Sequence, residues 1–185
     1  ASDVYKRQLV FVPQDNLNTD ALYPGKYTYQ DDITPARQAE VVMENYDPSL
    51  AASMAQERAE RASRQAASSI MLVSGYNFGT GSSREQAATA LKYAGVPVVL
   101  AGSFSDVFKR NAINNGLICL QCPELVDDLT SAYAKDGKRG AGGRQPGELS
   151  VWLRDATVSL DSSTGTVTLL HSDGTEKRYT TRPAG

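Results

Sequence analysis

The sequence predicts an α/β fold with a mostly parallel central sheet and a C-terminal antiparallel hairpin. Between residues 70 and 122, three apolar runs of strand length alternate with two helix-forming stretches, the order that right-handed crossovers on a parallel sheet produce. A glycine-rich turn at 75–83 joins the first of these runs to its helix. From residue 148 onward, apolar and polar positions alternate between turns of Asp, Ser and Gly, which is typical of antiparallel strands.

Composition restricts the class of protein. The chain has 185 residues, of which 41% are hydrophobic and 22% charged, so a sizeable core can form and we expect one domain over 1–185. The 19 basic and 21 acidic residues nearly cancel, which removes the electrostatic basis for bulk nucleic-acid binding. No apolar run approaches the length of about 20 residues that spans a bilayer, so we expect no membrane partner. Two cysteines cannot form the disulfide framework of a small secreted protein, which favours a reducing compartment.

The first third of the chain predicts one strand and two helices. Residues 9–12 are a short apolar run, and the polar segments 15–20 and 23–25 indicate a long turn after it. The composition of 36–45 is helical. Residues 50–67 are rich in Ala, Arg, Glu and Gln, so they predict a mostly solvated helix with a narrow apolar face; the alternative is an insertion.

The central block supplies the core of the predicted fold. Strands are expected at 70–73, 96–100 and 117–120, and helices at 84–94, which Gly95 ends, and at 104–111.

A glycine-rich segment separates this block from the tail. The segment 135–147 has five glycines and four basic residues, so we interpret it as a loop whose charge is a solvated face. Beyond it, the alternating patterns at 148–153, 157–160 and 166–170 predict a hairpin extension over about 147–181, packed on the same core.

The turn at 79–85 carries the candidate chemistry. It follows a buried strand and precedes a helix, so unpaired backbone N–H groups are expected to point from the carboxyl edge of the sheet toward an anion. The sequence fits the S-x-x-E/Q capping box twice, starting at Ser82 or at Ser83, and Arg84 adds a planar fork suited to a carboxylate. The alternative is a capped helix that binds nothing. The turn lacks the Gly-Lys-Ser/Thr ending of a P-loop.

Four segments together resemble the swivel domain of the aconitase superfamily over roughly residues 9–125. They are Asp-Asn-Leu-Asn-Thr-Asp at 15–20, Gly-Tyr-Asn-Phe-Gly-Thr-Gly-Ser-Ser-Arg-Glu-Gln-Ala at 75–87, and the runs at 101–104 and 111–117. The resemblance implies a three-layer β/β/α swivel domain that forms one wall of an active site. Residues 23–32 and Gln86 are most similar to the fungal-type homoaconitase branch, which implies reversible hydration of homoaconitate to homoisocitrate in the α-aminoadipate route to lysine.

The resemblance also implies roles for individual residues. Ser82 would be the base that removes the proton from the substrate carbon, as an alkoxide stabilised by its surroundings. Ser83 and Arg84 would bind substrate carboxylate, and Asp20 would orient neighbouring groups. Lys26 lies near the position where the family places a cation for the distal carboxylate.

The cofactor that the resemblance implies is a [4Fe-4S] cluster, bound by domains outside this chain. Such a cluster needs three cysteines, and Cys119 and Cys122 are the chain's two, so we interpret them as structural residues of a buried strand and expect no metal site here. His171 has no partner at ligand spacing.

The implied partners are the cluster-bearing aconitase domains, in the same polypeptide or a large subunit, and a tricarboxylate substrate. A fungal parent would be mitochondrial and a prokaryotic one cytoplasmic. The alternatives are the small subunit of 3-isopropylmalate dehydratase, a non-catalytic anion-binding module and a structural interaction domain. Whether the chain is a natural subunit or a piece of a longer polypeptide stays open, although the 50–67 insertion favours a piece.

Overall fold

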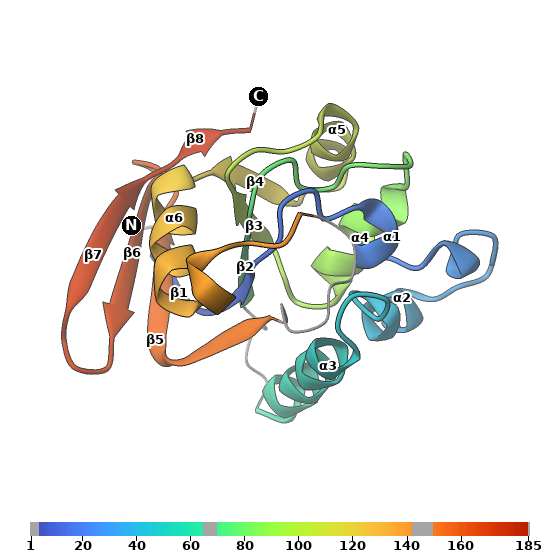
Figure 1. Ribbon diagram of the computed structural model, residues 1–185. Helices are drawn as coiled ribbons and strands as arrows, with labels where there is room; N and C mark the ends of the chain where they lie inside the picture. Colours follow the sequence, from blue (N-terminus) through green and yellow to red (C-terminus); the bar gives the residue numbers. More distant parts are fainter. Residues whose placement is uncertain (1–3, 65–69, 142–149, 185) are drawn as a thin grey trace.

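The fold is built on one mixed sheet, which we describe from a computed structural model covering residues 4–64, 70–141 and 150–184. Its strand order is β7-β6-β5-β1-β2-β3-β4-β8 (Figure 1). The strands are β1 (Val4–Val12), β2 (Ile70–Ser74), β3 (Val98–Ala101), β4 (Ile118–Gln121), β5 (Val151–Asp161), β6 (Thr166–His171), β7 (Glu176–Thr180) and β8 (Arg182–Pro183). Strands β1 to β4 are parallel to one another, whereas β5 to β7 form an antiparallel extension and β8 runs antiparallel to β4.

The two edges of the sheet are formed by consecutive pieces of chain. Strand β7 pairs with β6 at one edge, and β8 pairs with β4 at the other, although a single residue separates β7 from β8. The sheet therefore curls back on itself, and β5 to β7 form a second layer beside β1 to β4 (Figure 1).

The helices lie on both faces of the parallel strands. They are α1 (Thr19–Leu22), α2 (Pro35–Val41), α3 (Pro48–Ser63), α4 (Glu85–Tyr93), α5 (Asp106–Asn114) and α6 (Pro123–Tyr133), with 3-10 turns at Gly25–Tyr27 and Lys135–Gly137. Helices α1 to α5 form the third layer, on the face of the parallel strands that carries Val10 and Val12, whereas α6 packs on the opposite face, inside the curl. None of the helices, within the part of the chain that the structure describes, is long and apolar enough to cross a membrane.

Strand β1 shows how the two cores arise, because its side chains alternate between faces. Val10 and Val12 belong to a core shared with α2, α4 and α5. Leu9 and Phe11 belong to a second core, inside the curl, which includes apolar residues of β5, β6 and α6. This arrangement confirms the predicted β/β/α layering with a mostly parallel central sheet.

The predicted helix at 50–67 is α3, and its narrow apolar face is confirmed. Asp47 caps it and accepts a hydrogen bond from the backbone N–H of Leu50 at 3.1 Å. Its buried side chains are Leu50, Ala51, Met54 and Glu57. Glu57 is tied to the sheet, since Gln8 Nε2 donates to its Oε1 at 2.7 Å. The helix ends at Ser63, and residues 65–67 of the prediction lie outside the described residues.

Three expectations about the second half need correction. Helix α6 was not predicted, although Pro123 at its start and the buried side chains of Leu125, Val126 and Leu129 are helix signals. Residues 151–161 form one strand where two were expected, and β7 extends the predicted antiparallel hairpin of β5 and β6 to a three-stranded meander. Strand β4 is only partly buried, with Ile118 44% exposed, because the two-residue β8 covers little of it.

Candidate functional site

Three loops meet at the carboxyl edge of the parallel strands. They follow β1, β2 and β3, whose ends share one edge of the sheet. The loop after β2 is bonded to the loop after β3, since the backbone N–H of Phe78 donates to Ser103 O at 3.0 Å and that of Ser105 donates to Phe78 O at 2.9 Å.

The loops after β1 and β2 run side by side as a hydrogen-bonded ladder, which we call the loop ladder. Its backbone bonds are Gly75 N to Gln14 O at 2.9 Å, Asn16 N to Tyr76 O at 2.7 Å, Gly79 N to Leu17 O at 2.8 Å and Thr19 N to Thr80 O at 2.8 Å. A side-chain bond from Asn77 Nδ2 to Asn16 Oδ1, at 2.9 Å, adds to them. The motifs at 15–20 and 75–87 thus belong to one structural unit.

The turn between β2 and α4 requires glycine for a steric reason. Gly79 has φ +80°, and a Cβ added there would lie 2.6 Å from Phe108 Cδ1. Phe108 packs edge-on against Phe78, with ring centroids 5.2 Å apart. The chain therefore approaches an aromatic ring as closely as only glycine permits, and Gly81, at φ +103°, continues the turn.

The structure brings Arg84 and Asp20 together. Arg84 NH1 lies 3.1 Å from Asp20 Oδ1 and 3.3 Å from the carbonyl oxygen of Tyr23. Asp20 also accepts from the backbone N–H of Gly25 at 2.8 Å and from Asn45 Nδ2 at 3.2 Å. The Gly25 N–H, followed by the Arg84 guanidinium, holds the pKa of the Asp20 carboxyl below its usual value. The guanidinium is thereby fixed at the site.

Ser82 and Ser83 are exposed, and neither hydroxyl has a hydrogen-bond partner among the described residues. The predicted capping boxes are wrong: α4 begins at Glu85, and its N-cap is Arg84, in extended conformation without a side-chain cap. Because the Arg84 side chain is bonded to Asp20, residue 84 stays extended and both serines lie outside the helix. Their hydroxyls are available to a ligand.

Lys26 lies on the 3-10 turn that begins at Gly25, next to the N–H that binds Asp20. Its side chain is exposed, with Nζ 5.1 Å from the centroid of the Tyr27 ring, and no described carboxylate pairs with it. Lys26 therefore lies near the site as an exposed cation.

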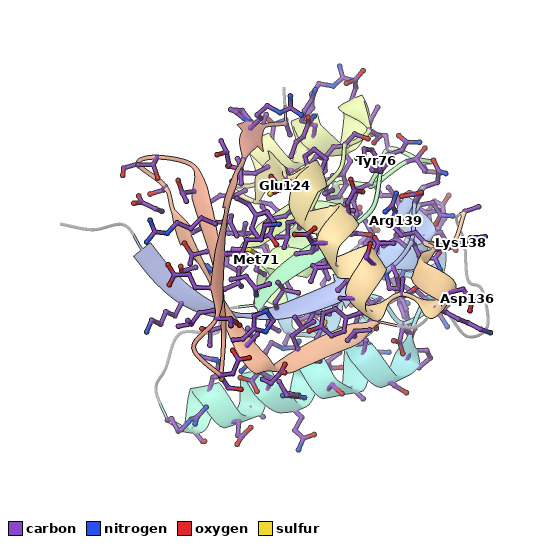
Figure 2. The ribbon with its side chains drawn as sticks, turned by 60° about the vertical axis from the view of Figure 1, so that its left-hand side comes forward. Met71, Tyr76, Glu124, Asp136, Lys138 and Arg139 are labelled. Atoms are coloured by element: carbon purple, nitrogen blue, oxygen red, sulfur yellow. The ribbon has the colours of Figure 1, made fainter. Side chains whose placement is uncertain are left out.

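Sequence reasoning missed a second ion pair at the root of the loop ladder. Arg139 Nε lies 2.8 Å from Asp15 Oδ1, and its guanidinium stacks over the ring of Tyr76, 5.3 Å from the centroid (Figure 2). The interpretation of 135–147 as a solvated basic face is wrong for Arg139, whose side chain is 16% exposed. Residues 142–147 of that segment lie outside the described residues.

The described donor side chains do not fit an iron–sulfur cluster. The described residues contain no group of three His, Cys, Asp or Glu side chains that could hold a metal ion. Burial raises the pKa of Cys119 to about 12 and also raises that of Cys122, which disfavours the thiolates that a cluster needs. Cys122 is the N-cap of α6, so its predicted place on the strand is wrong, whereas Cys119 lies on β4.

The site is open on the side of the serines. Both serine side chains are exposed, and the hollow lined by Leu129, Tyr133 and Leu169 lies away from them, between α6 and the meander. The loops at the sheet edge therefore present groups without enclosing a ligand, as one wall of a larger pocket does.

Comparison with known proteins agrees with this geometry. Residues 14–125 match the family described as the aconitase C-terminal domain. A protein named mitochondrial homoaconitase from Mycosarcoma maydis is 58% identical over 182 residues, covering 96% of this chain and 24% of the relative. The protein of that name from Cryptococcus neoformans is 53% identical over 184 residues, covering 98% of this chain and 25% of the relative. The chain thus spans about a quarter of the length of these relatives.

A solved structure extends the comparison to the fold. A crystal structure of 3-isopropylmalate dehydratase from Methanocaldococcus jannaschii has a TM-score of 0.63 and 26% identity, covering 97% of this chain and 82% of that one. The family match includes the whole loop ladder, Asp20 and Arg84. The chain belongs to the aconitase C-terminal domain family.

Proposed function

We propose that this chain is the swivel domain of a mitochondrial homoaconitase, a hydro-lyase that reversibly hydrates homoaconitate to homoisocitrate in lysine biosynthesis. The observation that carries the proposal is that two exposed hydroxyls lie beside a guanidinium held by Asp20. The proteins that match this chain over nearly all of its own length bear the name homoaconitase. The enzyme's other domains or a large subunit would supply the rest of the pocket, because the loops here form one wall only.

Ser82 is the proposed base. It would take the proton from the substrate carbon during dehydration and return it during hydration. A serine oxygen is a poor base unless hydrogen-bond donors stabilise its anion. The backbone N–H groups of residues 82–84 have no hydrogen-bond partner among the described residues, and the Arg84 guanidinium is adjacent in sequence. These donors support an alkoxide at Ser82.

Ser83 and Arg84 are the proposed carboxylate contacts. Asp20 and the Tyr23 carbonyl both use the NH1 nitrogen of Arg84. The rest of the guanidinium fork, together with the Ser83 hydroxyl, can donate to a substrate carboxylate. Asp20 would act as the orienting group. Lys26, as an exposed cation beside it, would meet the distal carboxylate.

The [4Fe-4S] cluster would belong to the cluster-bearing portion of the enzyme, since the part of this chain that the structure describes holds no donor set that fits it. The contribution of this chain is then proton transfer and carboxylate binding, and it would be inactive alone.

The test uses the full-length enzyme with its cluster assembled and measures turnover of homoaconitate. Ser82→Ala should lower kcat by about 10²–10⁴-fold, the usual contribution of a positioned base. Arg84→Lys keeps the charge but loses the fork, so it should mainly raise KM. Ser131→Ala, at an exposed serine on α6, is the matched control and should be unchanged. Wild-type kcat in Ser82→Ala would refute the role assignment.

The same enzyme should be assayed with 3-isopropylmalate, because the structural neighbour carries the name of that dehydratase. Faster turnover of 3-isopropylmalate than of homoaconitate would favour that alternative. If neither substrate reacts and calorimetry detects tight binding of phosphate or a nucleotide, the chain is an anion-binding module instead.

A further inference from the structure

Arg139 connects three parts of the fold that are distant in sequence. Its Nε bonds to Asp15 in the loop after β1, and its NH1 lies 2.8 Å from Thr130 Oγ1 and 3.6 Å from Asp127 Oδ1, both on α6. Its guanidinium covers the ring of Tyr76 in the loop after β2 (Figure 2). Asp15 Oδ1 also accepts the backbone N–H of Tyr76 at 2.8 Å. One carboxylate oxygen thus joins Arg139 to both loops.

The packing around this pair leaves no spare room. A Cβ at Gly75 would lie 3.0 Å from Arg139 Cδ and 2.5 Å from the carbonyl oxygen of Gln14, and it would clash with Asp15 Oδ1. A Cβ at Gly102 would lie 2.7 Å from the Tyr76 ring. At both glycines, neighbouring side chains occupy the space that a Cβ would need. The positions of Asp15, Tyr76 and Arg139 are therefore set by van der Waals contact as well as by charge.

The backbone around Arg139 continues the contact. Gly140 N donates to Pro13 O at 2.9 Å, Asp15 N donates to Gly140 O at 2.8 Å, and Asn16 Nδ2 donates to Ala141 O at 3.1 Å. The segment after α6 therefore lies along the root of the loop ladder like a short added strand.

The loop ladder joins this root to the proposed catalytic turn. Its bonds run from Gln14 and Gly75 to Thr19 and Thr80, and the next ion pair beyond them is Asp20 with Arg84. Each end of the ladder thus has an aspartate from the first loop paired with an arginine. A shift at Asp15 would be passed along the bonded backbone to Ser82 and Arg84.

We propose that Arg139 and Asp15 form a positioning pair that sets the register of the loop ladder and thereby the place of Ser82 in the pocket. The proposal rests on the proposed function for its kinetic consequence. Neither residue touches substrate. Proton transfer depends more steeply on distance than charge attraction does, so loss of the pair should affect kcat more than KM.

The first test is kinetic, in the full-length enzyme with its cluster. Arg139→Gln should lower kcat about tenfold, with KM within about twofold of wild type, because a misplacement of less than 1 Å costs less than the 10²-fold of a full one. Arg139→Lys can still reach Asp15 and should recover most of the loss. Arg61→Gln is the control, because Arg61 is similarly buried, at 20% against 16%, and pairs with Glu57 on α3. It should keep the wild-type kcat.

The second test needs no turnover. Amide hydrogen exchange in the substrate-free enzyme should speed up at Tyr76, Asn16 and Thr19 in Arg139→Gln and in Asp15→Asn, but not in Arg61→Gln. Faster exchange at Tyr76 alone would show that the contact is local, and this would overturn the proposal. An unchanged kcat in Arg139→Gln would also overturn it, provided that Arg139→Gln and Arg61→Gln lower the free energy of unfolding equally. If the wild type fails to convert homoaconitate, the proposed function falls, and hydrogen exchange alone decides the role of the pair.

Discussion

Replacing Gly79 by alanine tests the steric account of the turn that carries Ser82. The left-handed backbone at φ +80° costs a non-glycine residue about 1–2 kcal/mol. The added Cβ would also lie 2.6 Å from Phe108 Cδ1, in a buried aromatic cluster that cannot yield easily, and such overpacking costs about 1–3 kcal/mol. Gly79→Ala should therefore lower the free energy of unfolding by about 2–5 kcal/mol, the sum of these two effects.

The measurement is urea unfolding followed by circular dichroism, with Gly174→Ala as the matched control. Gly174 has φ +91° in the turn between β6 and β7, and a Cβ there would meet nothing within 4 Å. Gly174→Ala should lower the free energy of unfolding only by the cost of the left-handed backbone, about 1–2 kcal/mol. Equal losses in the two variants would refute the reasoning, because the contact with Phe108 would then contribute nothing.

Two further predictions concern titration and thiol reactivity. Since the Gly25 N–H and then Arg84 lower the pKa of Asp20 from 3.8, its stabilising contribution is present above that value and is lost as the pH falls through the folded pKa. Asp20 is half exposed, so the free energy of unfolding of wild type should exceed that of Asp20→Asn by less than about 1 kcal/mol at pH 7, and the difference should shrink as the pH falls below 3.8; a pH-independent difference would contradict this. Iodoacetamide should alkylate Cys119 and Cys122 slowly at pH 8 and quickly in urea, because burial raises the pKa of both thiols; equal rates in both conditions would contradict their burial.

The parallel core could be predicted from sequence because its signals are local. Each signal is a short continuous stretch of sequence, such as the apolar run at 70–73, the glycine turn after it, and the helix that ends at Gly95. The curl of the sheet could not be predicted from sequence. The pairing of β8 with β4 is only two residues long, and it joins residues that are about sixty positions apart. Helix α6 has local signals in Pro123 at its start and in the buried Leu125.

The sequence motifs could indicate candidate site residues but not how they are arranged. The ion pair between Asp20 and Arg84 joins two of these candidates, from loops that are far apart in the sequence. The capping boxes failed because the pattern S-x-x-E/Q does not show that the Arg84 side chain is tied to a loop 64 residues away. Arg139 lies 124 positions from Asp15 within a glycine-rich basic stretch, where composition indicates exposure. The roles of Ser82, Ser83, Arg84, Asp20 and Lys26 all stay predictions.

The bond between Asp20 and Arg84 has a consequence for how an anion reaches this edge of the sheet. A carboxylate approaching from bulk water meets, in Arg84, a cation whose charge is already offset by its neighbour, so Arg84 adds little to the field at long range. Capture by Arg84 then depends on the alignment of donors at short range, and long-range attraction, with its dependence on ionic strength, falls to exposed cations such as Lys26.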